Sequence, residues 1–245
     1  MACLRKWRFW LAFLLVIPSG GAAQELSLSL GEGGSISART IQLILLITVL
    51  SLAPGLAIMI TCFPFLITVL AILRQGIGLQ QSPPNMLIVS LALFLTYFVM
   101  EPVFTEAWET GIQPMVEETL DVEPALERAL VPFRSFMAAR IDADTFQAMA
   151  DLRPDGAAIQ LSPEAPLSVL MPSFMLSEIA RAFQIGFLIF LPFLIIDLVV
   201  AAVLMSMGMM MVPPATVSLP FKLAFFVIAD GWALIASALV RSYAP

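Results

Sequence analysis

The sequence predicts an all-α, membrane-associated protein in which two kinked helical hairpins flank an acidic, mainly helical extracytoplasmic segment. Of the 245 residues, 60% are hydrophobic and the mean hydropathy is +0.97, whereas soluble domains are about 45–50% apolar. The long apolar segments occur as two pairs, and a bend containing Pro-Pro joins the members of each pair. The residues between the two pairs are rich in carboxylates, which separates the hairpins.

The amino-terminal residues 1–23 are typical of a secretory signal peptide. Three Lys and Arg residues precede a short apolar core, and small residues up to Ala23 suit cleavage at that point. An uncleaved first membrane helix is the alternative, although the apolar core is short for one. Residues 24–40 are Ser- and Gly-rich without a hydrophobic period, which predicts a flexible leader.

Residues 41–104 predict the first helical hairpin. As a single helix, the apolar segment 41–73 would be about 50 Å long, which exceeds the thickness of a bilayer core. We therefore expect Pro54 and Pro64 to kink this segment or to divide it into two shorter helices. A short polar bend follows, and the second apolar segment covers residues 86–103.

Residues 105–170 predict the acidic segment. Up to residue 166 it contains twelve Asp and Glu but only four Arg, a balance that is typical of a solvated surface. Helices are expected at 114–128, 132–141 and 145–152. Because the segment is poor in basic residues and follows a complete hairpin, the positive-inside tendency favours the periplasmic side of the membrane.

Residues 171–245 predict the second helical hairpin, with apolar segments at 183–212, kinked at Pro192, and at 219–240. Five of the fourteen methionines lie within seven residues at the turn. Methionine is flexible and polarizable, Gly208 loosens the backbone, and Pro213 and Pro214 fix a bend. By composition the run is typical of an apolar connector, although a soft apolar loop also suits a seal.

Ionisable residues within the second hairpin predict its register. Facing residues in an antiparallel hairpin are equidistant from its tip, and the pairs Asp197–Lys222 and Glu178–Arg241 share one midpoint inside the methionine run. Charges in apolar segments usually pair or line a wet path. We expect Asp197 and Lys222 to form an ion pair that fixes the register, with a proton relay as the alternative. Proline kinks can displace the outer pair.

The sequence gives little support to catalysis. It contains no histidine, its two cysteines are far apart, and it has no phosphate-binding glycine loop. We therefore expect neither an enzyme nor a site for a metal or cofactor. The net charge of −6 argues against nucleic acid as a partner, because nucleic-acid binding calls for clustered Lys and Arg.

Several blocks of sequence carry a family resemblance that covers most of the chain from about residue 41 to 243. The blocks are Pro83-Pro84-Asn85, Leu91 to Thr96, Pro172 to Glu178, Ala182 to Asp197, Met207 to Thr216, Leu219 to Leu223 and Asp230-Gly231-Trp232. They closely resemble the FliP/SctR family of export-gate subunits of type III protein secretion. The resemblance implies helical hairpins that form a pentameric ring and wind with FliQ-like and FliR-like subunits into a closed helical gate.

The resemblance also implies a place and further partners: the flagellar basal body in the bacterial inner membrane, FlhA-like and FlhB-like export components, and unfolded export substrates. The methionine gasket of the family carries over onto Met209, Met210 and Met211. Its charged hairpin positions carry over onto Glu178, Asp197 and Lys222.

The partner of Glu178 is left open by the sequence. The resemblance implies a basic residue from the acidic segment, for which Arg140 is the nearest candidate, whereas the hairpin register favours Arg241. The chain also departs from the family at Pro64-Phe65, where a Thr-Arg pair is common.

Three alternatives to a flagellar export gate remain. Related subunits of virulence injectisomes generally lack a cleaved signal, so residues 1–40 favour the flagellar system. A small-solute transporter would use Asp197 and Lys222 as a coupling site. A purely structural nucleus for assembly of the secretion apparatus is compatible with a gate.

Overall fold

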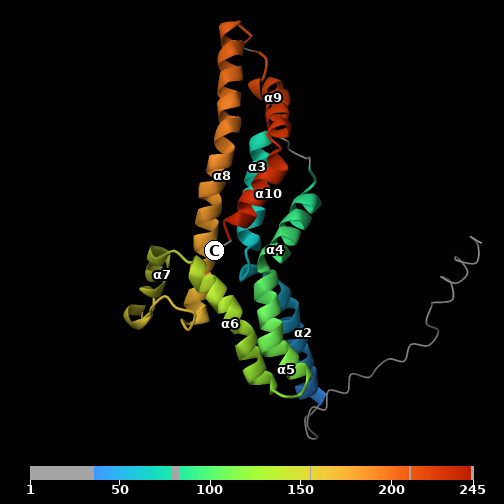
Figure 1. The fold of residues 1–245 in the computed structure, drawn as a ribbon, viewed down its shortest axis with the longest axis vertical. Helices are drawn as coiled ribbons and strands as arrows, with labels where there is room; N and C mark the ends of the chain where they lie inside the picture. Colours follow the sequence, from blue (N-terminus) through green and yellow to red (C-terminus); the bar gives the residue numbers. More distant parts are fainter. Residues whose placement is uncertain (1–35, 79–82, 155, 210, 244–245) are drawn as a thin grey trace, which may run out of the picture. The chain divides into compact units, whose positions relative to one another are not determined.

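The computed structural model describes residues 36–78, 83–154, 156–209 and 211–243, and all regular secondary structure in these ranges is helical (Figure 1). The predicted signal peptide and most of the leader lie outside the described residues. In chain order, the helices are α2 (Ile36–Met59), α3 (Phe63–Ile77), α4 (Asn85–Ala107), the π-helix η1 (Trp108–Ile112), α5 (Gln113–Val116), α6 (Val122–Arg140), α7 (Ala143–Ala150), the 3-10 helix η2 (Gly156–Ala158), α8 (Leu167–Ser206), α9 (Pro214–Ile228) and α10 (Gly231–Arg241).

The chain divides into two units, Met1–Thr48 and Val49–Pro245. The described part of the first unit is the amino-terminal half of α2. The second unit contains the rest of both predicted hairpins and the acidic segment, and the features below belong to it.

The first apolar segment is divided into two helices, α2 and α3. The break falls between Met59 and Phe63, and Pro64 occupies the first turn of α3, where a missing N–H breaks no helical hydrogen bond. Gly78 ends α3 in the left-handed conformation, with φ of 88°. With 15 residues, α3 is about 22 Å long and does not cross a bilayer core of about 30 Å by itself.

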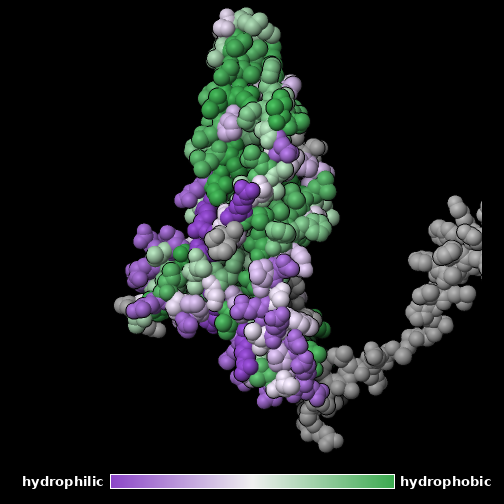
Figure 2. Space-filling view, in the orientation of Figure 1, coloured by the Kyte–Doolittle hydropathy of each residue, from purple (hydrophilic) through white to green (hydrophobic). Residues whose placement is uncertain are grey.

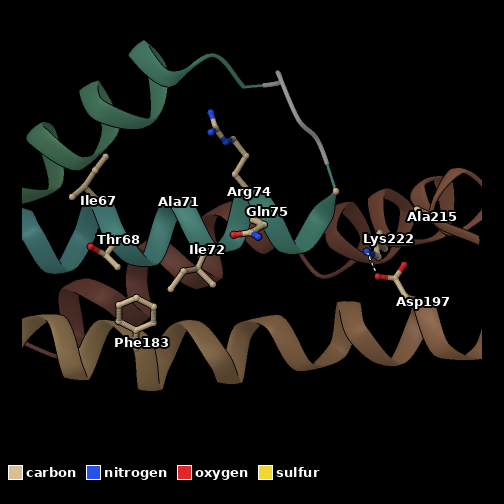
Figure 3. Close-up of a pocket in the computed structure, with 11 residues that line it drawn as sticks. Ile67, Thr68, Ala71, Ile72, Arg74, Gln75, Phe183, Asp197, Ala215 and Lys222 are labelled. Carbon is tan, nitrogen blue, oxygen red and sulfur yellow. Dashed lines mark hydrogen bonds and ion pairs between the residues drawn. The ribbon is translucent and has the colours of Figure 1, made fainter.

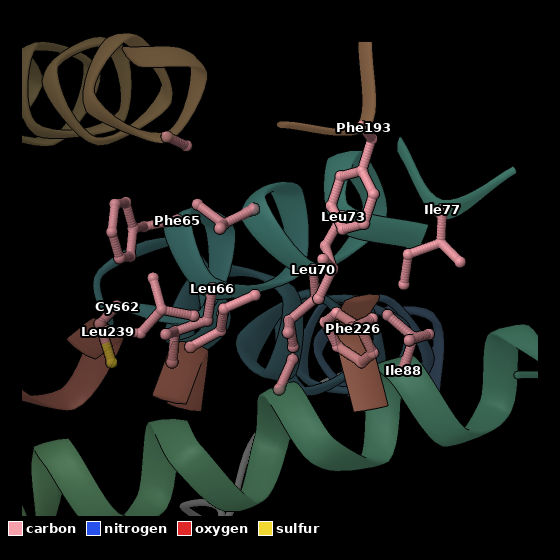
Figure 4. Packing of buried hydrophobic residues seen from close by; sticks show 14 of the residues in the cluster. Cys62, Phe65, Leu66, Leu70, Leu73, Ile77, Ile88, Phe193, Phe226 and Leu239 are labelled. Carbon is pink, nitrogen blue, oxygen red and sulfur yellow. The ribbon is translucent and has the colours of Figure 1, made fainter. Parts of the chain in front are cut away.

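Helix α3 is central to the hydrophobic core. Its buried apolar residues lie three or four positions apart, as on one helix face: Leu66, Val69, Leu70, Leu73 and Ile77. This face packs against α4, α8 and α9 (Figure 4). Ile72 of the same helix also approaches α8 closely, because a Cβ at Gly186 would lie 2.4 Å from Cδ1 of Ile72. The core therefore joins the first hairpin to the second.

The second apolar segment continues beyond its predicted end. Helix α4 passes through Pro102 and continues into η1 and α5, so that residues 85–116 form one helical run. The π-helical turn lies where α6 crosses the run. There Gly111 allows close approach, since a Cβ at this position would lie 2.6 Å from the carbonyl oxygen of Ala125.

The acidic segment has a different division into helices from the predicted one. The expected helix 114–128 is interrupted between α5 and α6, where Glu118 has a positive φ of 56°. Pro132 lies inside α6 and does not begin a helix. Arg134 donates hydrogen bonds of 3.1 Å to the carbonyl oxygens of Pro163 and Ala165, which holds the loop before α8 against α6.

Helix α7 begins at a side-chain cap. The carboxylate of Asp142 accepts the backbone N–H of Thr145 at 3.0 Å. The Thr145 hydroxyl donates to the same carboxylate oxygen at 3.0 Å, and the two hydrogen bonds lower the pKa of Asp142. Helix α7 packs on α8 around a second, smaller hydrophobic cluster that includes Phe146, Leu170 and Phe174.

The second hairpin consists of one long helix and two short ones. Helix α8 has 40 residues and continues through Pro172 and Pro192 without a break. The expected second helix of the hairpin, 219–240, is wrong as a single element: α9 and α10 meet at an angle of 61°. Asp230, with φ of 48°, lies at this bend, and sequence patterning did not reveal it.

Two helical runs in the described residues, 85–116 and 167–206, are long and apolar enough to cross a membrane. The bent pair α9–α10 makes a third if it is counted as one span. The protein is thus an all-α membrane protein, and its described residues contain two or three span candidates where the sequence has four apolar segments.

Candidate functional site

The methionine run forms the tip of the second hairpin. Helix α8 closes with Gly208 at φ of 73°, while the N–H groups of Gly208 and Met209 donate to the carbonyl oxygens of Met205 and Leu204 at 3.0 and 2.9 Å. This is the Schellman pattern of a helix end, in which glycine takes the left-handed position. Gly208 therefore has a defined role in ending α8, and its role as a hinge stays a prediction.

The methionines at the tip are exposed. Met209 is 41% exposed and Met211 is 98% exposed, while Met210 lies outside the described residues. Met205 and Met207 are also exposed. Pro213 and Pro214 follow the loop, and α9 begins at Pro214. Exposed apolar side chains of this kind in a defined turn suit contact with something outside this chain.

An apolar groove of about 580 Å³ lies between α8 and α9 directly below the tip. It is lined only by hydrophobic side chains, among them Val199, Val203, Met207, Met209 and Phe221. The visible surface over this end of the hairpin is mostly hydrophobic, whereas hydrophilic residues gather over α6 and α7 (Figure 2). The tip and the groove together form one continuous apolar end of the hairpin.

Asp197 and Lys222 form an ion pair between α8 and α9. Lys222 Nζ lies 2.6 Å from Asp197 Oδ2 and also donates to the carbonyl oxygen of Gly76 at 3.0 Å (Figure 3). The hydroxyl of Ser218 donates to Asp197 Oδ1 at 2.5 Å. Because Gly76 lies in the last turn of α3, the lysine binds the negative end of that helix as well as the carboxylate.

The two partners differ in burial. The lysine side chain is 7% exposed, whereas the aspartate side chain is 34% exposed and lines a pocket of about 900 Å³ between α3, α8 and α9. Arg74 lines the same pocket and is hydrogen-bonded to Asn85. The sequence reasoning missed Ser218 and the carbonyl of Gly76; the signal for Ser218 was its position one turn before Lys222.

Glu178 is fully buried at the other end of the hairpin and has several partners. Arg140 Nε donates to Glu178 Oε1 at 3.1 Å, Arg181 Nη1 lies 3.8 Å from the same oxygen, and the Tyr243 hydroxyl donates to Oε2. Arg140 Nη1 also donates to the carbonyl oxygen of Ser242 at 2.8 Å. This buried cluster joins α6, α8 and the residues after α10.

The register-based pairing of Glu178 with Arg241 is incorrect in this structure. Arg241 ends α10 and is not among the ion-pair partners of Glu178 in the described part of the chain. The physical reason is the bend of 61° between α9 and α10. Because of this bend, α10 does not continue the antiparallel register that α9 has with α8. Glu178 is paired instead with Arg140, the candidate that the family resemblance implied.

Among the described residues, no three His, Cys, Asp or Glu side chains lie close enough together to hold a metal ion. The second hairpin has an exposed apolar tip, an ion pair between α8 and α9, and a buried ion pair at the end away from the tip.

Comparisons with known proteins identify the family. The model of the FliP family matches residues 46–239 of the chain. The flagellar biosynthetic protein FliP of Caulobacter vibrioides is 49% identical over 233 residues, which cover 93% of this chain and 86% of that protein. The proteins of the same name from Agrobacterium fabrum and Bacillus subtilis are 45% and 43% identical, over 95% and 83% of this chain and 97% and 92% of their own. The chain therefore belongs to the FliP family.

Proposed function

We propose that this protein is a core subunit of the export gate of flagellar type III secretion. Several copies, five in the ring that the family resemblance implies, would assemble with FliQ-like and FliR-like subunits into a closed pore for unfolded flagellar substrates. FlhA-like and FlhB-like components would deliver those substrates. The gate would lie in the flagellar basal body at the inner membrane, with the acidic segment on the periplasmic side. The names of the relatives support the flagellar system over an injectisome.

The observation that carries this proposal is the apolar tip of the second hairpin. Met209 and Met211 are exposed just after the carboxy-terminal end of α8, next to a groove that only hydrophobic side chains line. A ring of such tips would bring unbranched, polarizable side chains to one level. These side chains would exclude ions from the empty pore and deform around a passing polypeptide.

The length of α8 supports the proposal that this helix packs against other protein subunits. Its 40 residues correspond to about 60 Å, which is twice a bilayer core of about 30 Å. Glu178 and Asp197 divide this length, and many side chains between them, such as Phe187, Leu188 and Ile195, are exposed. A helix of this length with ionisable groups inside its apolar stretch fits better among other helices than in lipid alone.

The gasket is tested by deleting Met209–Met211 in cells that lack their own copy of the protein. We expect the gate complex to assemble with unchanged mass in gentle detergent, while the membrane leaks small ions. The matched control is Met86→Ala, which removes a 78% exposed methionine from the start of α4. Normal assembly without a leak would contradict the gasket and leave a purely structural role.

The mass of the detergent-purified complex separates the gate from a small-solute transporter. A homogeneous ring-sized complex supports the gate. A monomer with saturable solute uptake, lost on Asp197→Asn, would contradict the gate and favour a transporter that uses the Asp197–Lys222 pair.

A further inference from the structure

We infer that Tyr243 is a positioning residue that fastens the carboxy-terminal end of the second hairpin to the buried Glu178–Arg140 pair. We refer to Ser242 and Tyr243 as the carboxy-terminal latch. Both follow the last residue of α10, and both bind the cluster: the Ser242 carbonyl accepts from Arg140, and the Tyr243 hydroxyl donates to Glu178. The latch does not depend on the proposed export function.

The hydrogen bonds of Glu178 show why the tyrosine hydroxyl matters. Both arginines, Arg140 and Arg181, approach Oε1, at 3.1 and 3.8 Å. Among the described residues, the Tyr243 hydroxyl is the hydrogen-bond donor to Oε2. Glu178 is 0% exposed, so water does not replace a lost donor. A buried carboxylate oxygen without a donor is costly, and Tyr243 therefore completes the cluster.

The tyrosine ring is held by three further contacts. It stacks on Phe136 of α6, with an interplanar angle of 15° and centroids 6.0 Å apart, and meets Phe65 of α3 edge-on at 5.5 Å. The guanidinium carbon of Arg140 lies 4.0 Å from the ring centroid, within the range of a cation–π contact. The latch therefore fixes the end of α10 against α3 and α6 at once.

The latch gives the returning arm, α9 and α10, a second polar attachment to the rest of the chain. Helix α10 follows α9 after the bend at Asp230 and packs on it through Trp232, whose ring meets Phe226 edge-on at 5.3 Å. The Glu178 cluster lies at the opposite end of α8 from the tip. With the latch formed, the returning arm is held at the Glu178 cluster by Tyr243 and near the tip by Lys222. Without it, the described contacts that hold this arm would be the Lys222 ion pair near the tip and the apolar packing of residues such as Ile235 and Leu239.

The surroundings of Tyr243 keep it in the donor form. Burial raises the pKa of Tyr243 well above its ordinary value, and the charge of Glu178 on α8 raises it further. Arg140 on α6 opposes this shift, and Cys62 before α3 adds slightly to it; Arg181 is the other charged group at the carboxylate. The hydroxyl thus remains protonated as long as the cluster is intact.

A mutant cycle tests the latch in the purified full-length protein. Tyr243→Phe keeps the ring contacts and removes the hydroxyl, and we expect the melting temperature to fall by about 3–8 °C. In the apolar background Arg140→Leu/Glu178→Leu, where the carboxylate is gone, the same substitution is expected to change it by less than about 1 °C. Equal losses in both backgrounds would overturn the latch, because Tyr243 would then act through its ring alone.

The matched control is Tyr97→Phe, which alters the other of the two tyrosines. Tyr97 is 65% exposed, its ring lies near Phe104, and no hydrogen bond of its hydroxyl is seen among the described residues. We expect no shift in melting temperature from this substitution. A loss as large as that of Tyr243→Phe would also overturn the inference.

A spectroscopic measurement decides the question if the apolar background does not accumulate. The Tyr97→Phe protein retains Tyr243 as its sole tyrosine. Its tyrosinate absorbance is expected to appear on raising the pH only together with unfolding, followed by circular dichroism. Titration near the ordinary pKa of about 10 while the helices remain intact would overturn the latch.

Discussion

The two ends of the second hairpin are built in opposite ways. At one end, Glu178 is fully buried and bonded to side chains from α6, α8 and the residues after α10. At the other end, Met209 and Met211 are exposed beside an empty apolar groove. The first end pairs its buried carboxylate with side chains of this chain, while Nη2 of Arg140 has no hydrogen-bond partner among the described residues. The second end leaves apolar surface exposed.

The two ion pairs follow the same contrast. The Glu178 pair lies where no water reaches the carboxylate, whereas Asp197 is 34% exposed and can be hydrated when its partner is removed. Two acidic residues of α8 therefore have different structural roles. The buried pair joins distant parts of the fold, and the more exposed pair sets the position of α9 on α8 and α3.

The largest effect is expected from breaking the buried pair. Arg140→Leu leaves Glu178 without its main partner and should lower the free energy of unfolding by about 3–5 kcal/mol, measured by denaturant unfolding in detergent. Arg128→Leu, at an exposed position of the same helix, is the control and should have almost no effect. Equal effects of the two substitutions would remove the contrast between the two ends.

A steric substitution tests how tightly the acidic segment is packed. In Gly111→Ala, the new Cβ would lie 2.6 Å from the Ala125 carbonyl oxygen, so α6 must move. We expect a loss of about 1–3 kcal/mol in thermal unfolding. The control Gly55→Ala lies in α2 with no atom within 4 Å of the new Cβ, and it should stabilise by up to about 1 kcal/mol. Destabilisation by both substitutions would point to a general intolerance of alanine.

A smaller effect is expected at the Asp197–Lys222 pair, in which the aspartate side chain is 34% exposed. Lys222→Met should cost about 1–2 kcal/mol, because Asp197 can regain water. The charge-swapped protein Asp197→Lys/Lys222→Asp should recover only part of this loss, since an aspartate at position 222 would face the Gly76 carbonyl oxygen that Lys222 now binds. Unfolding and the yield of assembled complex report both effects. A swapped protein no better than the single variants would contradict a direct pairing.

The smallest effect on stability is expected at the tip. Met211→Ser alters a side chain that is 98% exposed, so the free energy of unfolding of the isolated subunit should change by less than about 0.5 kcal/mol. Its effect should appear only as ion leakage of the assembled gate. A large loss of stability in the isolated subunit would show that the methionine packs within its own chain.

The sequence alone predicted the class of fold and the helix ends that depend on local chemistry. Apolar segments of membrane length predicted the long helices, and Pro64 marks the start of α3 because proline fits a first helical turn. Equal spacing from the hairpin tip predicted Asp197 opposite Lys222, and the structure places them 2.6 Å apart. These features depend on residues close in sequence or on regular helix geometry.

Tertiary structure alone decided the remaining features. The family resemblance named Arg140 as a candidate partner of Glu178, but its choice over Arg241 depends on the bend at Asp230, which hydrophobic periodicity does not reveal. Tyr243 binds Glu178 from a position 65 residues away in the chain, and the Gly76 carbonyl oxygen binds Lys222 from a position 146 residues away. Composition and periodicity describe one helix at a time. The partners of a buried charge depend on how separate helices pack, which the sequence pattern of a single helix does not contain.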